Sequence, residues 1–267
     1  MGFTTDNEGK RHYRIDANTG RFGFQGGRAN VSSMHNMSAG HFGASATFAR
    51  GARQIQEGAP LDPESHDPKQ SQYLYYVVGS ITSSVNGLEA AINEFFQDYV
   101  GQKSNLNSHL PDDLRMLLVN TWFYIKKEWS ILDKYHEALR VCAKEPIKGD
   151  NRSENAKLVV SLRNQLVHFK PVSWDSDPPI VPDDLEGLVR KLEGKFPTNP
   201  LIPESADFWP GKCLSFGCAE WALSSALAFR GLFFERMGRE DILLRPGMIP
   251  ILATSKPSSN EIGDLTR

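Results

Sequence analysis

A segment of thirty residues, 71 to 100, constrains the fold more than any other part of the chain. Apolar side chains recur in it at steps of mostly three and four: Leu74, Val77, Val78, Ile81, Val85, Leu88, Ile92, Phe95 and Phe96. At 3.6 residues per turn, this spacing gathers them on one face of an α-helix. The segment therefore predicts one long amphipathic helix.

Three further segments have helical character. The second runs from Pro111 to about residue 143 and opens with a proline and two aspartates, which suit the first turn of a helix. The third runs from Asn151, a candidate cap, to about residue 169, just ahead of a proline. The fourth, residues 211–238, is apolar around almost its whole circumference. Such a helix needs burial on several sides, in the centre of a bundle or at a dimer contact.

These segments predict an all-α fold, an antiparallel four-helix bundle over residues 71–245. Residues 1–70 are rich in Gly, Ser, Asn and His and show little helical periodicity, so we expect an irregular extension there. Alternating residues around an Asn-Thr-Gly turn favour a β-hairpin near residues 11–25. A weakly ordered tail is expected over residues 246–267.

Composition narrows the class of protein. The net charge of −2 argues against a surface coated in positive charge for holding long nucleic acid. The sequence shows no apolar signal segment at its start and no stretch of the ~18 apolar residues that a membrane helix needs, which predicts a cytoplasmic protein without a membrane partner. The three cysteines lack metal-type spacing, and His35 and His41 have no cysteine or acid at ligand spacing. We therefore expect no metal and no cofactor.

One residue breaks the apolar pattern of the third segment. On a helical wheel, Arg163 falls inside the arc that contains Val159 and Leu162. An arginine keeps its charge in proteins, and burying that charge without a partner costs several kcal/mol. Arg163 therefore either extends to solvent along its methylene groups, pairs with Glu89 or Glu220, or meets an anion.

Two polar neighbours make the anion interpretation stronger. Asn164 and His168 stand four residues apart on one stripe, beyond the edge of the apolar arc. With Arg163 they supply a cation suited to a phosphate, an orienting amide and a group that titrates near neutrality. In a regular helix Arg163 and His168 are separated by about 140°. A frayed helix end, or a second copy of the motif, would have to bring them around one phosphate.

The stretch RNQLVHF, residues 163–169, resembles the signature of the HEPN superfamily, which is an arginine, four to six residues and a histidine, with Asn, Asp or His after the arginine. The stretch SVNGLEAAINEFF is also similar to the first long helix of these all-helical domains. The resemblance covers about residues 71–240 in architecture, and some eight residues carry its specificity. It implies a metal-independent endoribonuclease in which two bundles pair, and the ribose 2′-hydroxyl attacks the adjacent phosphate to leave a cyclic phosphate.

By this resemblance, His168 would act as general base or acid, Arg163 would hold the phosphate, and Asn164 would orient both. Glu89 and Asn93, on a polar stripe of the first helix, are candidates to support them. The implied partners are single-stranded regions of RNA, a second copy of the chain as a homodimer, and an antitoxin or regulatory protein. A defence, toxin or RNA-processing setting fits these partners.

Two other hypotheses remain open. In the first, the chain is a noncatalytic HEPN-like module that binds a nucleotide, RNA or a protein partner through the same cleft. In the second, it is a plain helical interaction domain in which Arg163 pairs with Glu89 and His168 caps the end of its helix.

Overall fold

The computed structural model describes residues 2–5, 11–14, 20–25, 28–33, 37–58, 68–100, 111–170, 182–241 and 243. The chain divides into two compact units, Met1–Met37 and Ser38–Arg267. The tail expected over residues 246–267 lies outside the described residues.

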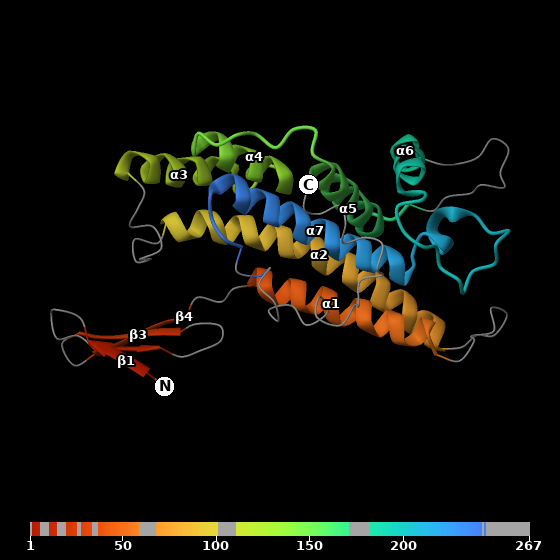
Figure 1. Ribbon diagram of the computed structural model, residues 1–267, viewed down its shortest axis with the longest axis horizontal. Coiled ribbons are helices and arrows are strands. Elements are labelled where there is room, and N and C mark those ends of the chain that lie inside the picture. The colour runs from red at the N-terminus through yellow and green to blue at the C-terminus, as the bar shows by residue number, and fades with distance from the viewer. Residues whose placement is uncertain are drawn as a thin grey trace. The chain divides into compact units, whose positions relative to one another are not determined.

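The smaller unit is an antiparallel sheet with the strand order β1-β2-β3-β4 (Figure 1). Its strands are β1 (Gly2–Thr5), β2 (Arg11–Arg14), β3 (Gly20–Gln25) and β4 (Arg28–Ser33). In the register of the sheet, Phe22 lies opposite Tyr13 on one side and opposite Val31 on the other. Strands β2 and β3 occupy the region, 11–25, for which the sequence favoured a hairpin. Regular pairing over four strands corrects the expectation of an irregular extension in this part of the chain.

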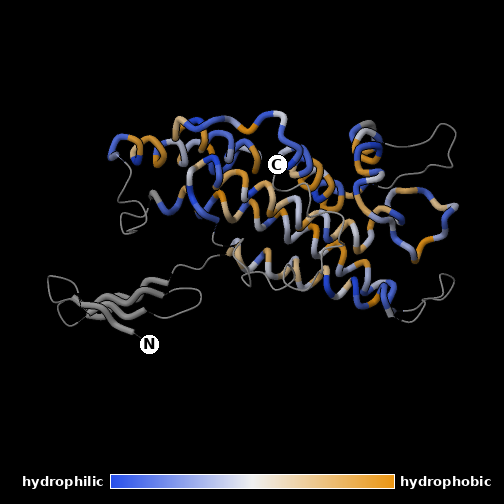
Figure 2. Tube along the Cα trace, viewed as in Figure 1, coloured by the Kyte–Doolittle hydropathy of each residue, from blue (hydrophilic) through white to orange (hydrophobic). Residues whose placement is uncertain are grey.

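Helix α1 (Met37–Gln56) is a second correction to the irregular extension expected over residues 1–70. Most of its buried face consists of small residues, so the sequence carries little hydrophobic period there. Figure 2 draws the helix in mostly pale tones, typical of such residues. Its buried residues are Ser38, Phe42, Ser45, Ala46, Ala49 and Ala52. Glycines receive aromatic rings of the neighbouring helix, since the ring of Phe42 lies against Gly87 and that of Tyr76 against Gly51, and this packing stabilises α1.

Helix α1 lies antiparallel along α2 (Pro68–Val100), the longest helix of the chain (Figure 1). At one end of the pair, the Oγ of Ser38 donates a hydrogen bond to Glu94 at 2.7 Å. At the other end, the Tyr73 hydroxyl donates to Gln56 at 2.8 Å. Between them, the buried hydroxyl of Ser45 bonds those of Ser80 and Ser84 at 3.1 and 2.8 Å. The contact is therefore specified by polar pairs as well as by close packing.

Helix α7 (Phe216–Met237) packs along α2 through aromatic rings. The rings of Phe95 and Phe233 meet edge to face with their centroids 5.2 Å apart. Tyr135 packs on Phe233 at 4.8 Å and donates a hydrogen bond to the Leu88 carbonyl at 2.8 Å. The placement of α7 in the core confirms the burial that its apolar circumference predicts.

The segment expected to form one helix from residue 111 to about 143 forms two, α3 (Asp112–Ile125) and α4 (Ile131–Val141). Ser130 caps α4, because its side chain accepts a hydrogen bond from the Asp133 amide. This local cap starts a new helix where the apolar pattern alone favours continuation.

Helix α5 (Asn151–Val167) packs against α2, α7 and the short helix α6 (Asp183–Leu192). The side chain of Asp150, one residue before the expected cap, accepts a hydrogen bond from the Arg152 amide. In the described residues after Ser38, the structure contains helices α1–α7 and the short π-helix η2 (Phe208–Lys212), and no strand. This larger unit is all-α, as predicted.

A buried ion pair closes the helical unit after α7. Arg230, in the middle of α7, donates a hydrogen bond to the carboxylate of Asp241, and both side chains are more than nine-tenths buried. The guanidinium also lies 4.9 Å from the ring centroid of Phe234. The pair attaches the residues that follow α7 to the core.

Replacing Gly87 with alanine should destabilise the helical unit by about 1–3 kcal/mol, because the new Cβ would lie 2.8 Å from the ring of the fully buried Phe42. Gly43, in the middle of α1, is the matched control, since a Cβ there meets no atom within 4 Å. Gly43→Ala should leave the free energy of unfolding unchanged or raise it by up to ~1 kcal/mol through helix propensity. Urea denaturation followed by circular dichroism measures both. Equal effects would contradict the close packing of α1 on α2.

Replacing Asp241 with alanine should cost about 3–5 kcal/mol, because it leaves the Arg230 charge buried without its partner. Glu186→Ala is the control, since it breaks the exposed pair with Arg190 and should change stability little. The free energies of unfolding of the two variants measure the contribution of the buried pair to stability. A loss in Asp241→Ala no larger than in the control would show that the pair does not hold the segment.

Candidate functional site

The end of α5 carries the Arg-Asn-His motif. Arg163 and Asn164 lie in the last two turns of the helix, and His168 is its C-cap, with φ −105° and ψ 42°. The His168 amide donates the final hydrogen bond of the helix to the Asn164 carbonyl at 2.9 Å. The backbone thus leaves the helical conformation at the histidine, where the chain turns away.

Arg163 is half-buried and its charge is not neutralised within the described residues. Its Nε is enclosed and has no hydrogen-bond partner there. Neither Glu89 nor Glu220, the acids that the sequence offers as internal partners, forms an ion pair with it. An arginine remains charged in such a place, and because the side chain is only half-buried, its guanidinium can meet water or an external anion.

The other two motif residues are exposed to solvent. Asn164 and His168 lie on the surface, and so do Val167 and Phe169, whose side chains are about half exposed. No hydrogen bond joins Arg163 to His168 in the described chain, although the two residues stand five apart at the end of one helix. One copy of the chain thus presents the three groups on neighbouring parts of one surface without assembling them.

Asn93 is engaged away from the motif. Its Oδ1 accepts a hydrogen bond from the Nζ of Lys134 on α4 at 3.4 Å. Lys134 is buried and lies 5.8 Å from the ring centroid of Trp122. Asn93 therefore supports a buried lysine.

The helix directions place Asn93 far from the end of α5. The Tyr73 hydroxyl accepts a hydrogen bond from the Phe216 amide at 2.7 Å, so α2 and α7 begin side by side. Arg152 at the start of α5 pairs with Glu235 at the end of α7, so α5 runs in the opposite direction. The end of α5 therefore points toward the first half of α2, whereas Asn93 lies in its last two turns. Glu89 makes no hydrogen bond or ion pair with Arg163 or His168 either.

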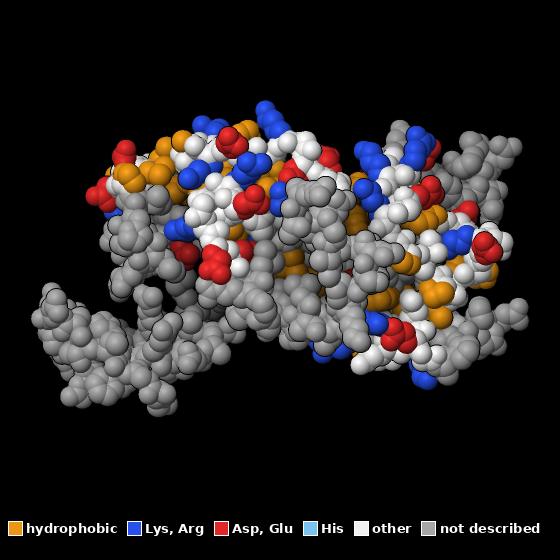
Figure 3. All heavy atoms as spheres, in the orientation of Figure 1, with side chains coloured by type: hydrophobic (Ala, Val, Ile, Leu, Met, Phe, Trp, Pro, Cys, Tyr) orange, Lys and Arg blue, Asp and Glu red, His pale blue; other side chains and the backbone are white. Residues whose placement is uncertain are grey.

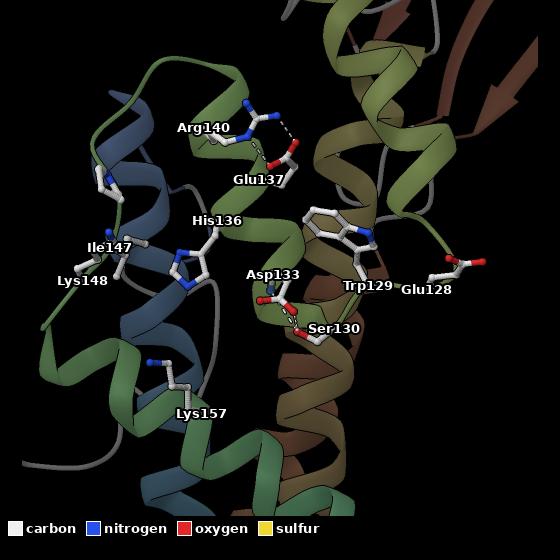
Figure 4. A pocket seen from close by; sticks show the side chains of 11 residues that line it. Glu128, Trp129, Ser130, Asp133, His136, Glu137, Arg140, Ile147, Lys148 and Lys157 are labelled. Atoms are coloured by element: carbon white, nitrogen blue, oxygen red, sulfur yellow. Dashed lines mark hydrogen bonds and ion pairs between the residues drawn. The ribbon is translucent and has the colours of Figure 1, made fainter.

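A pocket that sequence reasoning missed lies between α4, the loop that follows it and α5 (Figure 4). It has a volume of about 720 Å³. Its lining residues are Glu128, Trp129, Ser130, Asp133, His136, Glu137, Arg140, Pro146, Ile147, Lys148 and Lys157. The signal that could have found it is the polar face of α4, on which Asp133, His136, Glu137 and Arg140 recur at steps of three and four.

Half of the charged side chains that line this pocket form ion pairs. Arg140 binds Glu137 through two hydrogen bonds of 2.7 and 2.5 Å, and Lys157 pairs with Glu154 at 2.7 Å. Burial lowers the pKa of His136, and Asp133 opposes this effect. His136 is therefore favoured in its neutral form, and the pocket gathers no excess charge of one sign.

Metal and thiol chemistry receive no support from the ordered core. Among the residues that the structure describes, no group of three His, Cys, Asp or Glu side chains could hold a metal ion. Cys142, Cys213 and Cys218 are buried free thiols, and burial raises the pKa of Cys142 and Cys218. None of them is positioned as an accessible nucleophile.

Comparisons of the chain with protein-family models, with curated proteins and with solved structures find no match. Within the described ranges, every helix is too short or too polar to cross a lipid bilayer.

His136 should make the fold less stable in mild acid. Because its folded pKa lies below the unfolded value, the unfolded chain binds more protons, and stability falls as the pH drops from about 6.5 toward the folded pKa. In His136→Gln, the loss of stability that comes from protonation of His136 should disappear. Urea denaturation at several values between pH 7.5 and 5, with the exposed His168→Gln as control, measures the slope. An unchanged slope in His136→Gln would contradict the effect of burial.

Proposed function

We propose that the chain is a metal-independent endoribonuclease of the HEPN type, which cleaves single-stranded RNA at a site completed by two copies of the chain. The observation that carries the proposal is the unneutralised guanidinium of Arg163, half-buried on α5 beside the exposed Asn164 and His168. A charged group without an internal counterion favours an external anion, and guanidinium geometry suits a phosphate.

The contrast with Arg230 strengthens this argument. Arg230 on α7 forms a buried ion pair with Asp241 and contacts the ring of Phe234, although its Nε, like that of Arg163, has no hydrogen-bond partner in the described residues. Arg163 makes no comparable contact in the described part of the chain. Arg163 is only half-buried and no acid of the described residues occupies its guanidinium, so an external phosphate can bind it.

The proposed reaction uses two histidines. One His168 takes the proton of the ribose 2′-hydroxyl, and the 2′-oxygen forms a bond to the adjacent phosphorus. The bond from phosphorus to the 5′-oxygen breaks, and this oxygen receives a proton from the second copy of His168. Arg163 stabilises the added negative charge on the phosphate, and Asn164 orients the groups. The products are a 2′,3′-cyclic phosphate and a 5′-hydroxyl, and the 2′-hydroxyl requirement selects RNA over DNA.

The proposed site includes a second copy because one chain does not bring Arg163 and His168 together. His168 is exposed at the end of α5 and forms no hydrogen bond with Arg163 of its own chain. The exposed Val167 and Phe169 next to the motif provide apolar surface for a seam between two copies. A noncatalytic module that binds RNA through Arg163 is the second candidate, favoured by the same separation of Arg163 from His168.

Incubation of the purified chain with a fluorescent single-stranded RNA in EDTA should yield fragments with cyclic-phosphate ends. His168→Ala should lower the rate at least ~100-fold through loss of acid–base catalysis. Arg163→Lys should retain part of the activity that Arg163→Ala loses, because it keeps the charge without the fork of donors. His136→Gln is the matched histidine control and should cleave at the rate of the unaltered chain. Electrophoresis and mass spectrometry identify the ends.

Two results would change the conclusion. Cleavage that persists in His168→Ala would exclude the proposed mechanism. RNA binding that depends on Arg163 without any cleavage would favour the noncatalytic module.

A further inference from the structure

Helix α3 has two apolar faces, and only one of them is covered. The inner face buries Leu118, Trp122 and Ile125, and the Trp122 ring stacks on Phe96 with a centroid distance of 5.2 Å. The outer face exposes four large side chains: Met116 by 62%, Leu117 by 50%, Phe123 by 58% and Tyr124 by 82%. Apolar side chains gather on the surface over α3 (Figure 3). A concentration of this kind marks an interaction surface.

The residues of the outer face have the same spacing when counted from either end. The exposed residues that form it are Asp113, Met116, Leu117, Asn120, Phe123 and Tyr124 on α3 and Lys127 in the turn that follows, called here the α3 stripe. Their steps of 3, 1, 3, 3, 1 and 3 are symmetric about Asn120. The residue types suit this spacing as well. An apolar pair lies on each side of the Asn120 amide, and the acid at one end is matched by a base at the other end.

We infer that the α3 stripe binds the same stripe of a second copy of this chain, antiparallel about a two-fold axis at Asn120. In that arrangement Leu117 faces Phe123 of the other copy, and Met116 faces Tyr124. Each apolar side chain then meets an apolar one, and the same patch serves both copies, as a two-fold interface requires.

Charge complementarity identifies the occupant as a second copy. An antiparallel pair places Asp113 of one copy against Lys127 of the other, twice per interface, whereas a parallel pair would place like charges together. Both side chains are exposed, and neither forms an ion pair within the part of the chain that the structure describes. At the centre, two Asn120 amides can bond each other, and a central polar pair fixes the register of two helices.

This interface goes beyond the proposed nuclease site. The stripe lies on α3, whereas Arg163, Asn164 and His168 lie at the end of α5, and none of the stripe residues takes part in the proposed reaction. Loss of pairing through α3 should therefore halve the particle mass, whether or not the α5 ends form a seam of their own.

A cysteine at the axis tests the arrangement. In Asn120→Cys the two new thiols should face each other, so mild oxidation should give a disulfide-linked dimer in high yield. The three natural cysteines are buried and should not compete. Tyr75→Cys, at an exposed aromatic position on α2 outside the stripe, is the control and should remain uncross-linked. Equal yields in the two variants would overturn the two-fold arrangement.

Charge exchange gives a second test that does not depend on cross-linking. Asp113→Lys and Lys127→Asp should each weaken association about tenfold or more, because each places like charges together, and the double variant should restore it. Leu117→Glu should abolish pairing through α3 and halve the particle mass, whereas Tyr75→Glu should leave the mass unchanged. Sedimentation velocity on the full chain measures the mass. An unaltered chain that sediments as a monomer, or a double variant that fails to recover, would overturn the inference.

Discussion

The apolar face of helix α2 must be buried along the length of the helix. The helices on its two sides bury it through different kinds of contact. On one side, α1 approaches closely through glycine, alanine and serine, with the buried hydroxyls of Ser45, Ser80 and Ser84 bonded to each other. On the other side, aromatic rings of α7 and α4 fill the space. The remaining helices take their places from this axis, and α5 thereby presents its last turn to solvent.

Hydrophobic periodicity predicts the helices that bury large side chains. Helices α2 and α5 follow from the spacing of Leu, Val, Ile and Phe, and α7 follows from a run that is apolar around almost its whole circumference. The same signal misses α1, because its contact depends on small residues such as Ala46 and Ala49, whose burial has no clear period. It also misses the break between α3 and α4, because the cap formed by Ser130 outweighs continuation of an apolar pattern.

The candidate site was readable from the sequence only in part. An arginine within an apolar arc is visible on a helical wheel, so Arg163 could be singled out. The absence of an acidic partner for Arg163 could not be predicted, because residues in contact across helices are distant in sequence. The same limit applies to Asn93, which bonds Lys134 on α4, and to the pairing of Arg230 with Asp241. Residue type indicates what a group needs, and tertiary structure decides whether another residue provides it.

The role of Arg163 as a phosphate ligand can be measured at its own Nε. The chain labelled with ¹⁵N at arginine, titrated with a 2′-O-methyl RNA oligonucleotide that resists cleavage, reports the environment of each guanidinium by NMR, and Arg163→Lys assigns the resonance. If Arg163 holds a phosphate, its Nε resonance shifts in a saturable manner while that of the paired Arg230 stays in place. An Arg163 resonance that is unmoved when the oligonucleotide is bound would contradict this role.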